Sequence, residues 1–286
     1  MSEKTAKNQN SIKIPKIILL SVQFLELIST RLTTLFAVKL FTTPIKHKTP
    51  NRELLMDKNS VQQLINIPEI SKQILVYNYG SGTKKALLVH GWSGRGTQLF
   101  KIADDLIKND YTVISFDAPA HGKSPGKNTI MVEFIASILE IQKVYGTFDV
   151  AIGHSLGGMA LLNAVNLNFK IDKLITIGAG NKVINIFENF VKTLEMNPKQ
   201  SILLKNFFEK KYNRTLEELS SETNAKNIKI PVLVIHDQND DEVEVDCAIA
   251  INNVFENGSL LITNNLGHRK ILGDAAVIQR IIEFIA

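Results

Sequence analysis

The chain has 286 residues, of which 44% are hydrophobic and 21% are charged, enough for one large domain with a substantial buried core. A single cysteine, Cys247, excludes an internal disulfide framework and is compatible with a reducing compartment such as the cytoplasm. The formal net charge is +5, but residues 1–58 carry +6 and the remainder carries −1. A neutral body without a basic stripe argues against nucleic-acid binding.

The basic N-terminal arm, residues 1–58, has apolar residues at helical spacing between positions 14 and 41. Four charged residues interrupt this segment, and its longest uncharged stretch, 17–25, is far shorter than the ~20 residues of a membrane-spanning helix. Lysines precede it, as in a signal peptide, but no small-residue cleavage site follows. We expect an amphipathic helix that either packs on the body or holds a cytoplasmic protein peripherally on an anionic membrane.

Short apolar runs alternate with segments of helical periodicity from residue 84 onward. The pattern predicts strands at 84–91, 111–119, 148–155, 173–180, 231–238 and 259–267, and helices at 97–110, 131–146, 156–168 and 274–286. This rhythm is typical of an α/β fold with a mostly parallel, doubly wound sheet. Functional loops are then expected at the carboxyl ends of the strands.

Residues 181–228 interrupt the alternation with two to four helical segments, the last of them TLEELSS (215–221). We expect these helices to form a lid that is inserted between two strands. The predicted organisation is therefore an arm at 1–58, a core at 59–180, a lid at 181–228 and the rest of the core at 229–286.

The stretch AIGHSLGGMA (151–160) places Ser155 between a predicted strand and a predicted helix, with glycines on both sides. Glycines permit a very tight turn, which would push the serine hydroxyl out above the sheet at a helix N-terminus. The helix dipole at that point favours developing negative charge. In this context the G-x-S-x-G pattern predicts a nucleophile.

A serine nucleophile needs a base and a group that orients the base. Of six histidines, His268 follows the last predicted strand and can reach the turn at Ser155, whereas His90 and His121 stand in turns where backbone hydrogen bonding is the better explanation. His236 ends a strand and is expected to be buried or to stabilise a turn. His154 is adjacent to the serine but is expected to point away from it.

The orienting acid is expected in the loop HDQNDDEVEVD (236–246), where Asp237, Asp240 and Asp241 compete. Acids in such a loop are often solvated or cap the next helix. A calcium-binding loop would need a glycine at its sixth position, which this segment lacks. From the residues alone, Asp237, Asp240 and Asp241 all remain candidates for the orienting acid.

Residues 76–286 resemble the α/β-hydrolase superfamily. The resemblance rests on HGWSGRG (90–96), FDAPAHGKS (116–124), GHSLGG (153–158), HDQND (236–240) and GH (267–268), all in the family's order. More narrowly, the chain is similar to a group of bacterial hydrolases with a basic apolar arm that ends in an FTTP-like segment (41–44) and with a GHRKIL-like stretch (267–272). Ala120 departs from the family, which has glycine at this place.

The resemblance implies a catalytic triad of Ser155, Asp240 and His268, in which Asp240 matches the acid because it stands four positions after His236. It also implies an oxyanion hole made by the backbone N–H groups of Trp92 and Leu156. No cofactor and no metal are implied.

The expected activity is that of a serine hydrolase that cleaves a small-molecule or lipid-like acyl ester, as a carboxylesterase or lipase does. Peptidase and thioesterase activities are alternatives, as is a non-catalytic binding protein of the same fold. Trp92, His154, Phe187 and Phe190 are the expected substrate-binding side chains. Apolar lid residues at helical spacing, however, are more often the core of the lid itself; here they are Ile184, Phe187, Phe190, Leu203 and Phe207.

Overall fold

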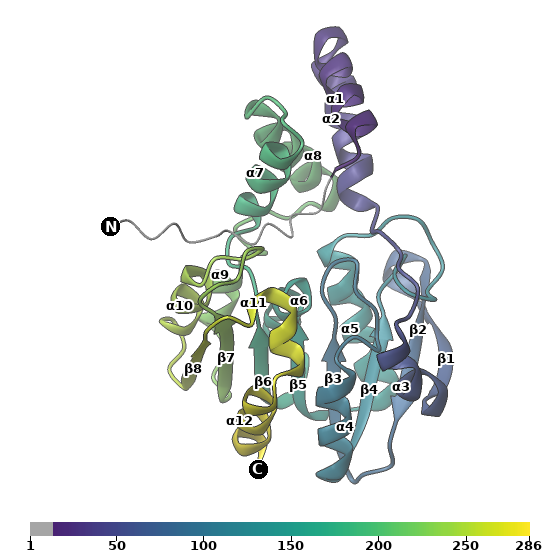
Figure 1. Ribbon diagram of the computed structural model, residues 1–286, viewed down its shortest axis with the longest axis vertical. Coiled ribbons are helices and arrows are strands. Elements are labelled where there is room, and N and C mark those ends of the chain that lie inside the picture. Colours follow the sequence, from purple (N-terminus) through teal and green to yellow (C-terminus); the bar gives the residue numbers. More distant parts are fainter. Residues whose placement is uncertain (1–13) are drawn as a thin grey trace.

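The computed structural model describes residues 14–286 and is built around one eight-stranded sheet (Figure 1). The strand order is β1-β2-β4-β3-β5-β6-β7-β8. The strands are β1 Val61–Ile67, β2 Lys72–Tyr79, β3 Lys84–Val89, β4 Tyr111–Asp117, β5 Phe148–His154, β6 Ile171–Ile177, β7 Val232–Asp237 and β8 Gly258–Thr263.

Strands β3 to β8 run parallel, which confirms the predicted mostly parallel sheet. Two further strands, β1 and β2, extend one edge of the sheet and pair antiparallel, with Leu64 opposite Leu75. The sequence-based prediction, which began at residue 84, missed both. β1 is an edge strand whose first four residues are exposed, so it lacks the apolar run that identified the buried strands.

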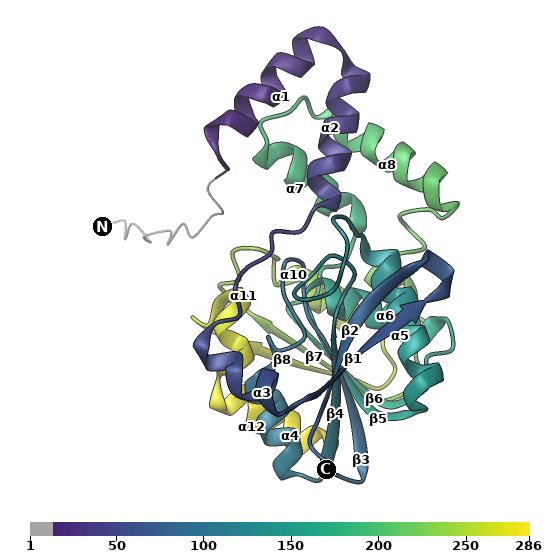
Figure 2. The same ribbon diagram turned by 90° about the vertical axis from the view of Figure 1, so that its right-hand side faces the viewer.

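Helices cover both faces of the sheet (Figure 2). One face packs against α5 (Met131–Tyr145), α6 (Leu156–Asn166) and α10 (Asp246–Asn252). The other face packs against α3 (Leu54–Asn59), α4 (Phe100–Lys108) and α12 (Ala275–Ile285). The inner strands β3 to β7 are therefore buried from two sides, as their apolar composition predicts, whereas the edge strands β1 and β8 are more exposed. Short elements complete the chain: the 3-10 turns at Asn51–Glu53, Pro68–Ile70 and Ile271–Gly273, and α11 (Gly267–Lys270).

Three helices are inserted between β6 and β7, namely α7 (Val183–Thr193), α8 (Lys199–Tyr212) and α9 (Ser221–Ala225). α7 and α8 pack against each other and rise above the end of the sheet at which β6 finishes (Figure 1). The prediction of a helix at 215–221 is wrong, because residues 216–219 form turns and α9 begins only at Ser221.

The N-terminal segment forms two helices instead of the single predicted helix. α1 (Lys16–Ile28) ends at Ser29, which has extended backbone angles, and α2 (Thr30–Thr42) begins there with the Ser29 hydroxyl accepting a hydrogen bond from the amide of Leu32. The two helices fold back on each other and stand beside α7 and α8 (Figure 2). Within residues 14–286, no helix is long and apolar enough to cross a bilayer.

Residues 51–59 return the chain from this hairpin to the sheet. Glu53 is buried and pairs with Arg95 Nε at 3.4 Å, and it also accepts a hydrogen bond of 2.8 Å from the Thr97 hydroxyl. Met56 is buried in the core cluster that contains α4 and α12. A chain that begins at residue 59 would therefore lose buried contacts of the sheet domain.

Candidate active site

Ser155 occupies the tight turn between β5 and α6, with φ 53° and ψ −120°. Its amide donates a 2.8 Å hydrogen bond to the carbonyl of Ile177 at the end of β6. The flanking glycines are required, because a Cβ on Gly153 would lie 2.6 Å from the backbone of Gly157, and one on Gly157 would lie 2.3 Å from the carbonyl oxygen of Val89. The left-handed φ of a non-glycine residue is a costly conformation that is common at functional sites.

His268 and Asp240 form a close pair beside this turn. His268, on α11, places Nδ1 2.7 Å from Oδ2 of Asp240, and both side chains are almost fully buried. The other carboxylate oxygen, Oδ1, accepts 2.9 Å hydrogen bonds from the amides of Glu242 and Val243. Since an ionised carboxylate can only accept, Nδ1 of His268 carries the proton and Nε2 keeps a free lone pair.

A second histidine faces the same carboxylate. Nε2 of the fully buried His236 donates a 2.9 Å hydrogen bond to the carbonyl of Val243 and lies 3.4 Å from Oδ2 of Asp240. Burial alone would raise the pKa of Asp240, but hydrogen bonds from His236 and His268 hold this pKa well below its usual range. Asp240 is thus an anion held in place from several sides.

The two competing aspartates of the same loop have other surroundings. Asp237 is buried and accepts hydrogen bonds from the Thr263 hydroxyl at 2.7 Å and from the amide of Leu266 at 3.1 Å, so it ties two loops together. Asp241 is exposed. Of the three aspartates that the residues alone left open, Asp240 is the one in contact with His268.

His154 links the serine turn to the histidine. Its Nε2 donates a 2.9 Å hydrogen bond to the backbone carbonyl of His268, and the two rings lie 4.6 Å apart. Burial, with the neighbouring His268 imidazole as a second cause, lowers the pKa of His154 to about 3, so its ring is neutral at pH 7. The side chain is only 2% exposed. A substrate would therefore reach His154, an expected substrate-binding residue, only if neighbouring groups moved.

The loop after β3 holds the amide of Trp92 in a defined direction. His90 Nε2 accepts a hydrogen bond from the amide of Ala118, so Nδ1 carries the proton and donates to the carbonyl of Gly91 at 2.7 Å. That carbonyl and the Trp92 N–H belong to one planar peptide and point in opposite directions. Among the described residues, the Trp92 amide meets no protein acceptor.

The next residue of the loop is held in a similar way. Ser93 donates its amide hydrogen to Nε2 of His121 at 3.0 Å, and the His121 ring packs edge-on against Trp92. The predicted backbone-bonding roles of His90 and His121 are thereby confirmed. Ala120, at the position where the family has glycine, adopts a left-handed φ of 64°. The left-handed region costs an alanine about 1–2 kcal/mol. The turn nevertheless adopts this conformation with alanine in place of glycine.

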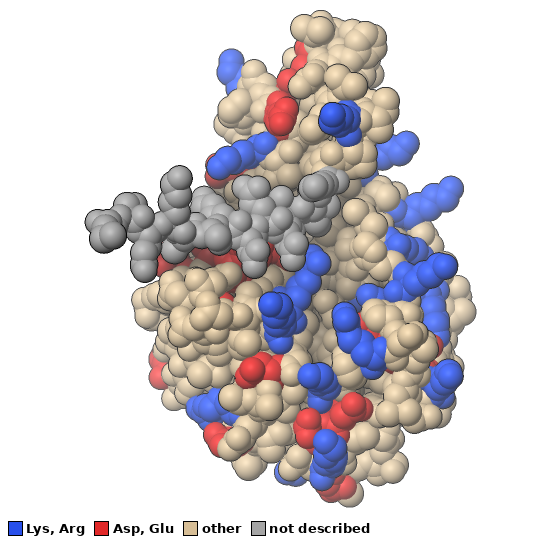
Figure 3. Space-filling view, viewed as in Figure 1, with Lys and Arg blue, Asp and Glu red and all other residues tan. Residues whose placement is uncertain are grey.

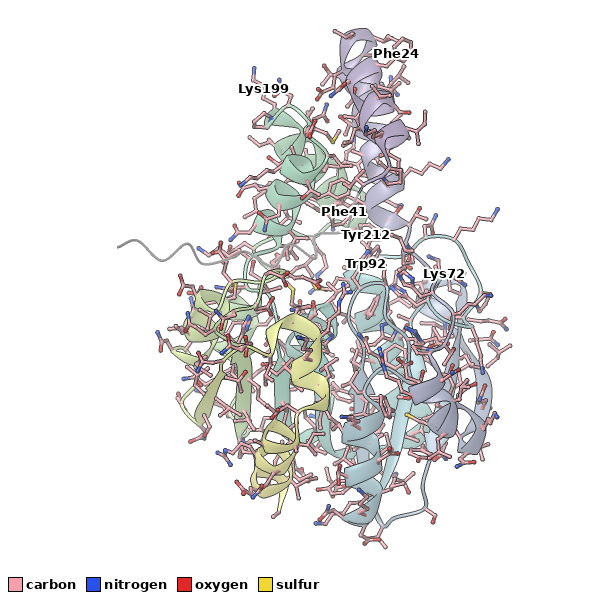
Figure 4. All side chains as sticks on the ribbon, in the orientation of Figure 1. Phe24, Phe41, Lys72, Trp92, Lys199 and Tyr212 are labelled. Carbon is pink, nitrogen blue, oxygen red and sulfur yellow. The ribbon has the colours of Figure 1, made fainter. Side chains whose placement is uncertain are left out.

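Aromatic side chains from three parts of the chain meet above this loop. Phe41 of α2 lies 6.4 Å from the ring of Trp92, 4.9 Å from Phe187 and 5.1 Å from Phe190, measured between ring centroids. Figure 4 shows Phe41 at the foot of α2, directly above Trp92. Phe187 is 2% exposed and belongs to the packed interior of this cluster, whereas Trp92 is 38% exposed.

Sequence reasoning missed two features close to His268. Gly178, just after β6, has φ +60°, and a Cβ there would lie 3.2 Å from Nδ1 of His268 and 3.5 Å from Oδ2 of Asp240. Glu242 places one oxygen 4.0 Å from Nε2 of His268 and the other 2.9 Å from the guanidinium of Arg269. Gly178 lies inside the predicted strand 173–180, and a glycine near the carboxyl end of that strand was the available signal.

No group of three or more His, Cys, Asp or Glu side chains in residues 14–286 is arranged to hold a metal ion. The arrangement offers a hydroxyl on a strained turn, a histidine with a free Nε2, a buried carboxylate and the free amide of Trp92. Such a set can generate a nucleophile and stabilise an oxyanion.

A family model described as the alpha/beta hydrolase fold matches residues 87–225. The protein has the α/β-hydrolase fold. Its solved structural neighbours include an esterase of Pyrococcus furiosus (17% identity, TM-score 0.64, 85% of this chain and 97% of that chain), an esterase of Exiguobacterium antarcticum (17%, 0.62, 79% and 99%) and a bromoperoxidase of Bacillus anthracis (15%, 0.62, 79% and 99%). These neighbours establish the fold, which confirms the resemblance seen in the motifs.

Among curated sequences, the chain is similar to a 2-hydroxy-6-oxononadienedioate/2-hydroxy-6-oxononatrienedioate hydrolase of Escherichia coli O81 (strain ED1a), with 26% identity over 145 residues. The match covers 45% of this chain and 48% of the relative. The chain thus matches about half the length of its curated relatives, and the likeness supports a hydrolase without defining a substrate.

Proposed function

We propose that this protein is a serine hydrolase that cleaves an acyl ester. The proposal rests on the 2.7 Å contact between Asp240 and His268, next to a serine on a left-handed strand-to-helix turn. A buried carboxylate in contact with a histidine, beside a serine, is the arrangement that activates a hydroxyl for acyl transfer.

In the proposed reaction, Ser155 Oγ attacks the acyl carbonyl while Nε2 of His268 takes its proton. Asp240 keeps the imidazole in the correct tautomer and stabilises the imidazolium. The developing oxyanion accepts hydrogen bonds from the amides of Trp92 and Leu156, both of which can point at it without reorganisation. His268 then protonates the leaving alcohol, and water releases the acyl group from Ser155 by the same steps.

The proposed substrate is a carboxylester or a lipid-like ester with an apolar acyl group. Trp92 is partly exposed beside its own amide, and Phe190 is partly buried in the aromatic cluster next to it, so both could contact an acyl chain. The helices α7 to α9 would act as a lid over this space. Peptidase and thioesterase activities use the same groups and are separated by the substrate panel below.

Reaction with a labelled fluorophosphonate and turnover of p-nitrophenyl esters of rising chain length test this function. Ser155→Ala should lose labelling and lower kcat by several orders of magnitude, leaving only the ~10³–10⁴-fold rate over water that binding and the oxyanion hole provide. Ser81→Ala, at an exposed serine after β2, is the matched control and should behave as the parent. A parent that neither labels nor turns over esters, amides or thioesters would identify a non-catalytic binding protein.

The arm at 1–58 extends the proposal to a cytoplasmic enzyme in peripheral contact with a membrane that supplies lipid-like esters. Residues 1–13 of the arm lie outside the described part of the chain. The support comes from residues 14–42, whose two helices stand beside the proposed lid.

A further inference from the structure

The helical hairpin formed by α1 and α2 buries only part of its apolar surface. Val22 of α1 and Ala37 of α2 are fully buried, and Thr34 Oγ1 donates a 2.8 Å hydrogen bond to Gln200 of α8. These contacts fix the hairpin against the inserted helices. These contacts bury one side of α1 and one side of α2, and the opposite side of each helix is exposed to solvent.

The open side carries large apolar residues in a regular pattern. The exposed residues of α1 recur every three or four positions and so share one face of that helix; they are Ile17, Leu20, Phe24, Leu27 and Ile28. Leu32 and Leu35 of α2 continue the exposed set. Leu27 is 88% exposed and Phe24 62%, and Figure 4 shows Phe24 pointing outward at the end of the molecule farthest from the sheet. Such a clustered apolar surface marks an interaction site.

The charges on the hairpin have a definite sign. Lys16, Arg31 and Lys39 are exposed, whereas the only acid between residues 14 and 42, Glu26, accepts a 2.7 Å hydrogen bond from the amide of Asn197 in the insertion. The acid is therefore turned towards the protein and the cations towards solvent. In the view of Figure 3, the upper end of the molecule is mostly tan, with Lys, Arg, Asp and Glu side chains scattered over it.

We propose that this exposed face of the hairpin docks on an anionic membrane surface. Apolar side chains would enter the boundary between head groups and acyl chains, and the flanking cations would lie among anionic head groups. The hairpin projects from one end of the molecule (Figures 1 and 2), a position that suits contact with a flat bilayer.

Docking would also orient the candidate site, a consequence that rests on the proposed hydrolase function. Phe41 joins the foot of the hairpin to the insertion on one side and to Trp92 on the other. The hairpin, the inserted helices and the loop that contains the Trp92 amide would therefore face the membrane together, and an ester would reach Ser155 from the lipid side.

Co-sedimentation of the full chain with vesicles tests the proposal. The full chain should bind vesicles of phosphatidylcholine with phosphatidylserine more tightly than pure phosphatidylcholine, and added salt should weaken this binding. The double variant Phe24→Asp/Leu27→Asp should lower the partition coefficient at least ~10-fold, because two buried apolar groups are lost. Arg31→Glu/Lys39→Glu should lower it by about 5-fold per charge on anionic vesicles only.

Val61→Asp is the matched control, since Val61 is 73% exposed on the distant edge strand β1, and it should bind as the parent does. Equal binding to both vesicle types, or a hairpin double variant that binds like the parent, would overturn the proposal. So would a full chain that ignores vesicles and forms a dimer that the double variant abolishes, because the face would then serve a second copy.

Two measurements separate this proposal from the proposed catalysis. Ser155→Ala should bind vesicles as tightly as the parent, because the serine is remote from the hairpin face. Phe24→Asp/Leu27→Asp should hydrolyse a water-soluble p-nitrophenyl ester at the parent rate. Loss of ester turnover in the parent would contradict the hydrolase without affecting the vesicle result.

Discussion

At the scale of single residues, the candidate site depends on one carboxylate oxygen. Oδ2 of Asp240 faces both His268 and His236, while Oδ1 is occupied by two backbone amides. We expect Asp240→Asn to lower kcat by about 10³–10⁴-fold, because an amide at Oδ2 favours the wrong tautomer of His268. Steady-state kinetics with a p-nitrophenyl ester would measure this effect.

Asp241→Asn is the control, because Asp241 is exposed in the same loop. It should leave kcat within a factor of about two, since it removes no contact with His268. Asp237→Asn should instead lower the stability of the fold, because Asp237 accepts hydrogen bonds from Thr263 and Leu266. If Asp241→Asn proved more damaging to kcat than Asp240→Asn, the assignment of the acid would be wrong.

Gly178 predicts a different kind of defect. Gly178→Ala should lower kcat by up to ~10-fold, because its Cβ would lie 3.2 Å from Nδ1 of His268, close enough to displace the imidazole by a few tenths of an ångström, and catalysis is sensitive to small misplacements. Gly146→Ala has the same unfavourable positive φ but meets only the end of Lys85 at 3.5 Å. Both variants should lose about 1 kcal/mol of stability, and only Gly178→Ala should lose activity. Equal activity in the two variants would exclude a steric role for Gly178.

At the scale of elements, Phe41 connects α2, the insertion and the loop after β3. Phe41→Ala should destabilise the protein by about 2 kcal/mol and shift the fluorescence emission of Trp92 to longer wavelength, because the ring that packs on the indole is removed. Trp92 is the only tryptophan, so the emission reports on the surroundings of this one indole.

Phe24→Ala supplies the comparison, since Phe24 is an exposed aromatic residue of the same hairpin. It should change stability by less than about 0.5 kcal/mol and leave the emission unchanged. Identical spectra for the parent and Phe41→Ala would show that the hairpin is not seated on Trp92 in solution.

The elements with strong periodicity could be predicted from the sequence, and the others could not. Strands buried on two faces, such as β3 and β7, contain the uninterrupted apolar runs ALLV and VLVI. In contrast, β1 reads VQQLINI and is recognised as a strand only by its pairing with β2. The break between α1 and α2 lies at Ser29, a capping residue whose signal was overlooked within an apolar segment.

The site shows the same division. The turn at Ser155 follows from glycine spacing and could be predicted from local sequence. The contact of Asp240 with His268 joins residues 28 positions apart and was assigned through family resemblance, since three nearby aspartates look alike in the sequence. The approach of Gly178 to His268 and the bond from His154 to the His268 carbonyl depend on tertiary packing, which periodicity does not encode.

At the scale of the whole molecule, buried neutral histidines should make the stability depend on pH. Burial lowers the pKa of His121 to about 4 and that of His154 to about 3, and it lowers the pKa of His90 well below 6.5. Below about pH 6.5 the unfolded chain takes up these protons and the folded chain does not, so the free energy of unfolding falls as the pH falls. Each histidine contributes up to about 1.4 kcal/mol per pH unit until the pH approaches its folded pKa.

Urea unfolding at about pH 7 and about pH 5 should therefore show a loss of about 3 kcal/mol or more. Burial raises the pKa of Asp117, so this carboxyl acts in the opposite direction to the histidines. His121→Asn should reduce the change in the free energy of unfolding between these two pH values by about one third, because one of the three buried histidines is removed. His47→Asn, at an exposed histidine, should leave the dependence unchanged. A stability that stays constant over this range would contradict the burial of neutral imidazoles.

The hydrogen bond between Thr34 and Gln200 joins residues that are 166 positions apart in the chain. The hairpin therefore leaves the ribosome long before the helix against which it packs. At about 5–20 residues per second, this interval lasts roughly 10–30 s, during which both apolar sides of the hairpin lack their partner. During synthesis, α1 and α2 are thus accessible to chaperones and lipid for a period. Once α8 is complete, it covers one side of the hairpin, and the other side stays exposed.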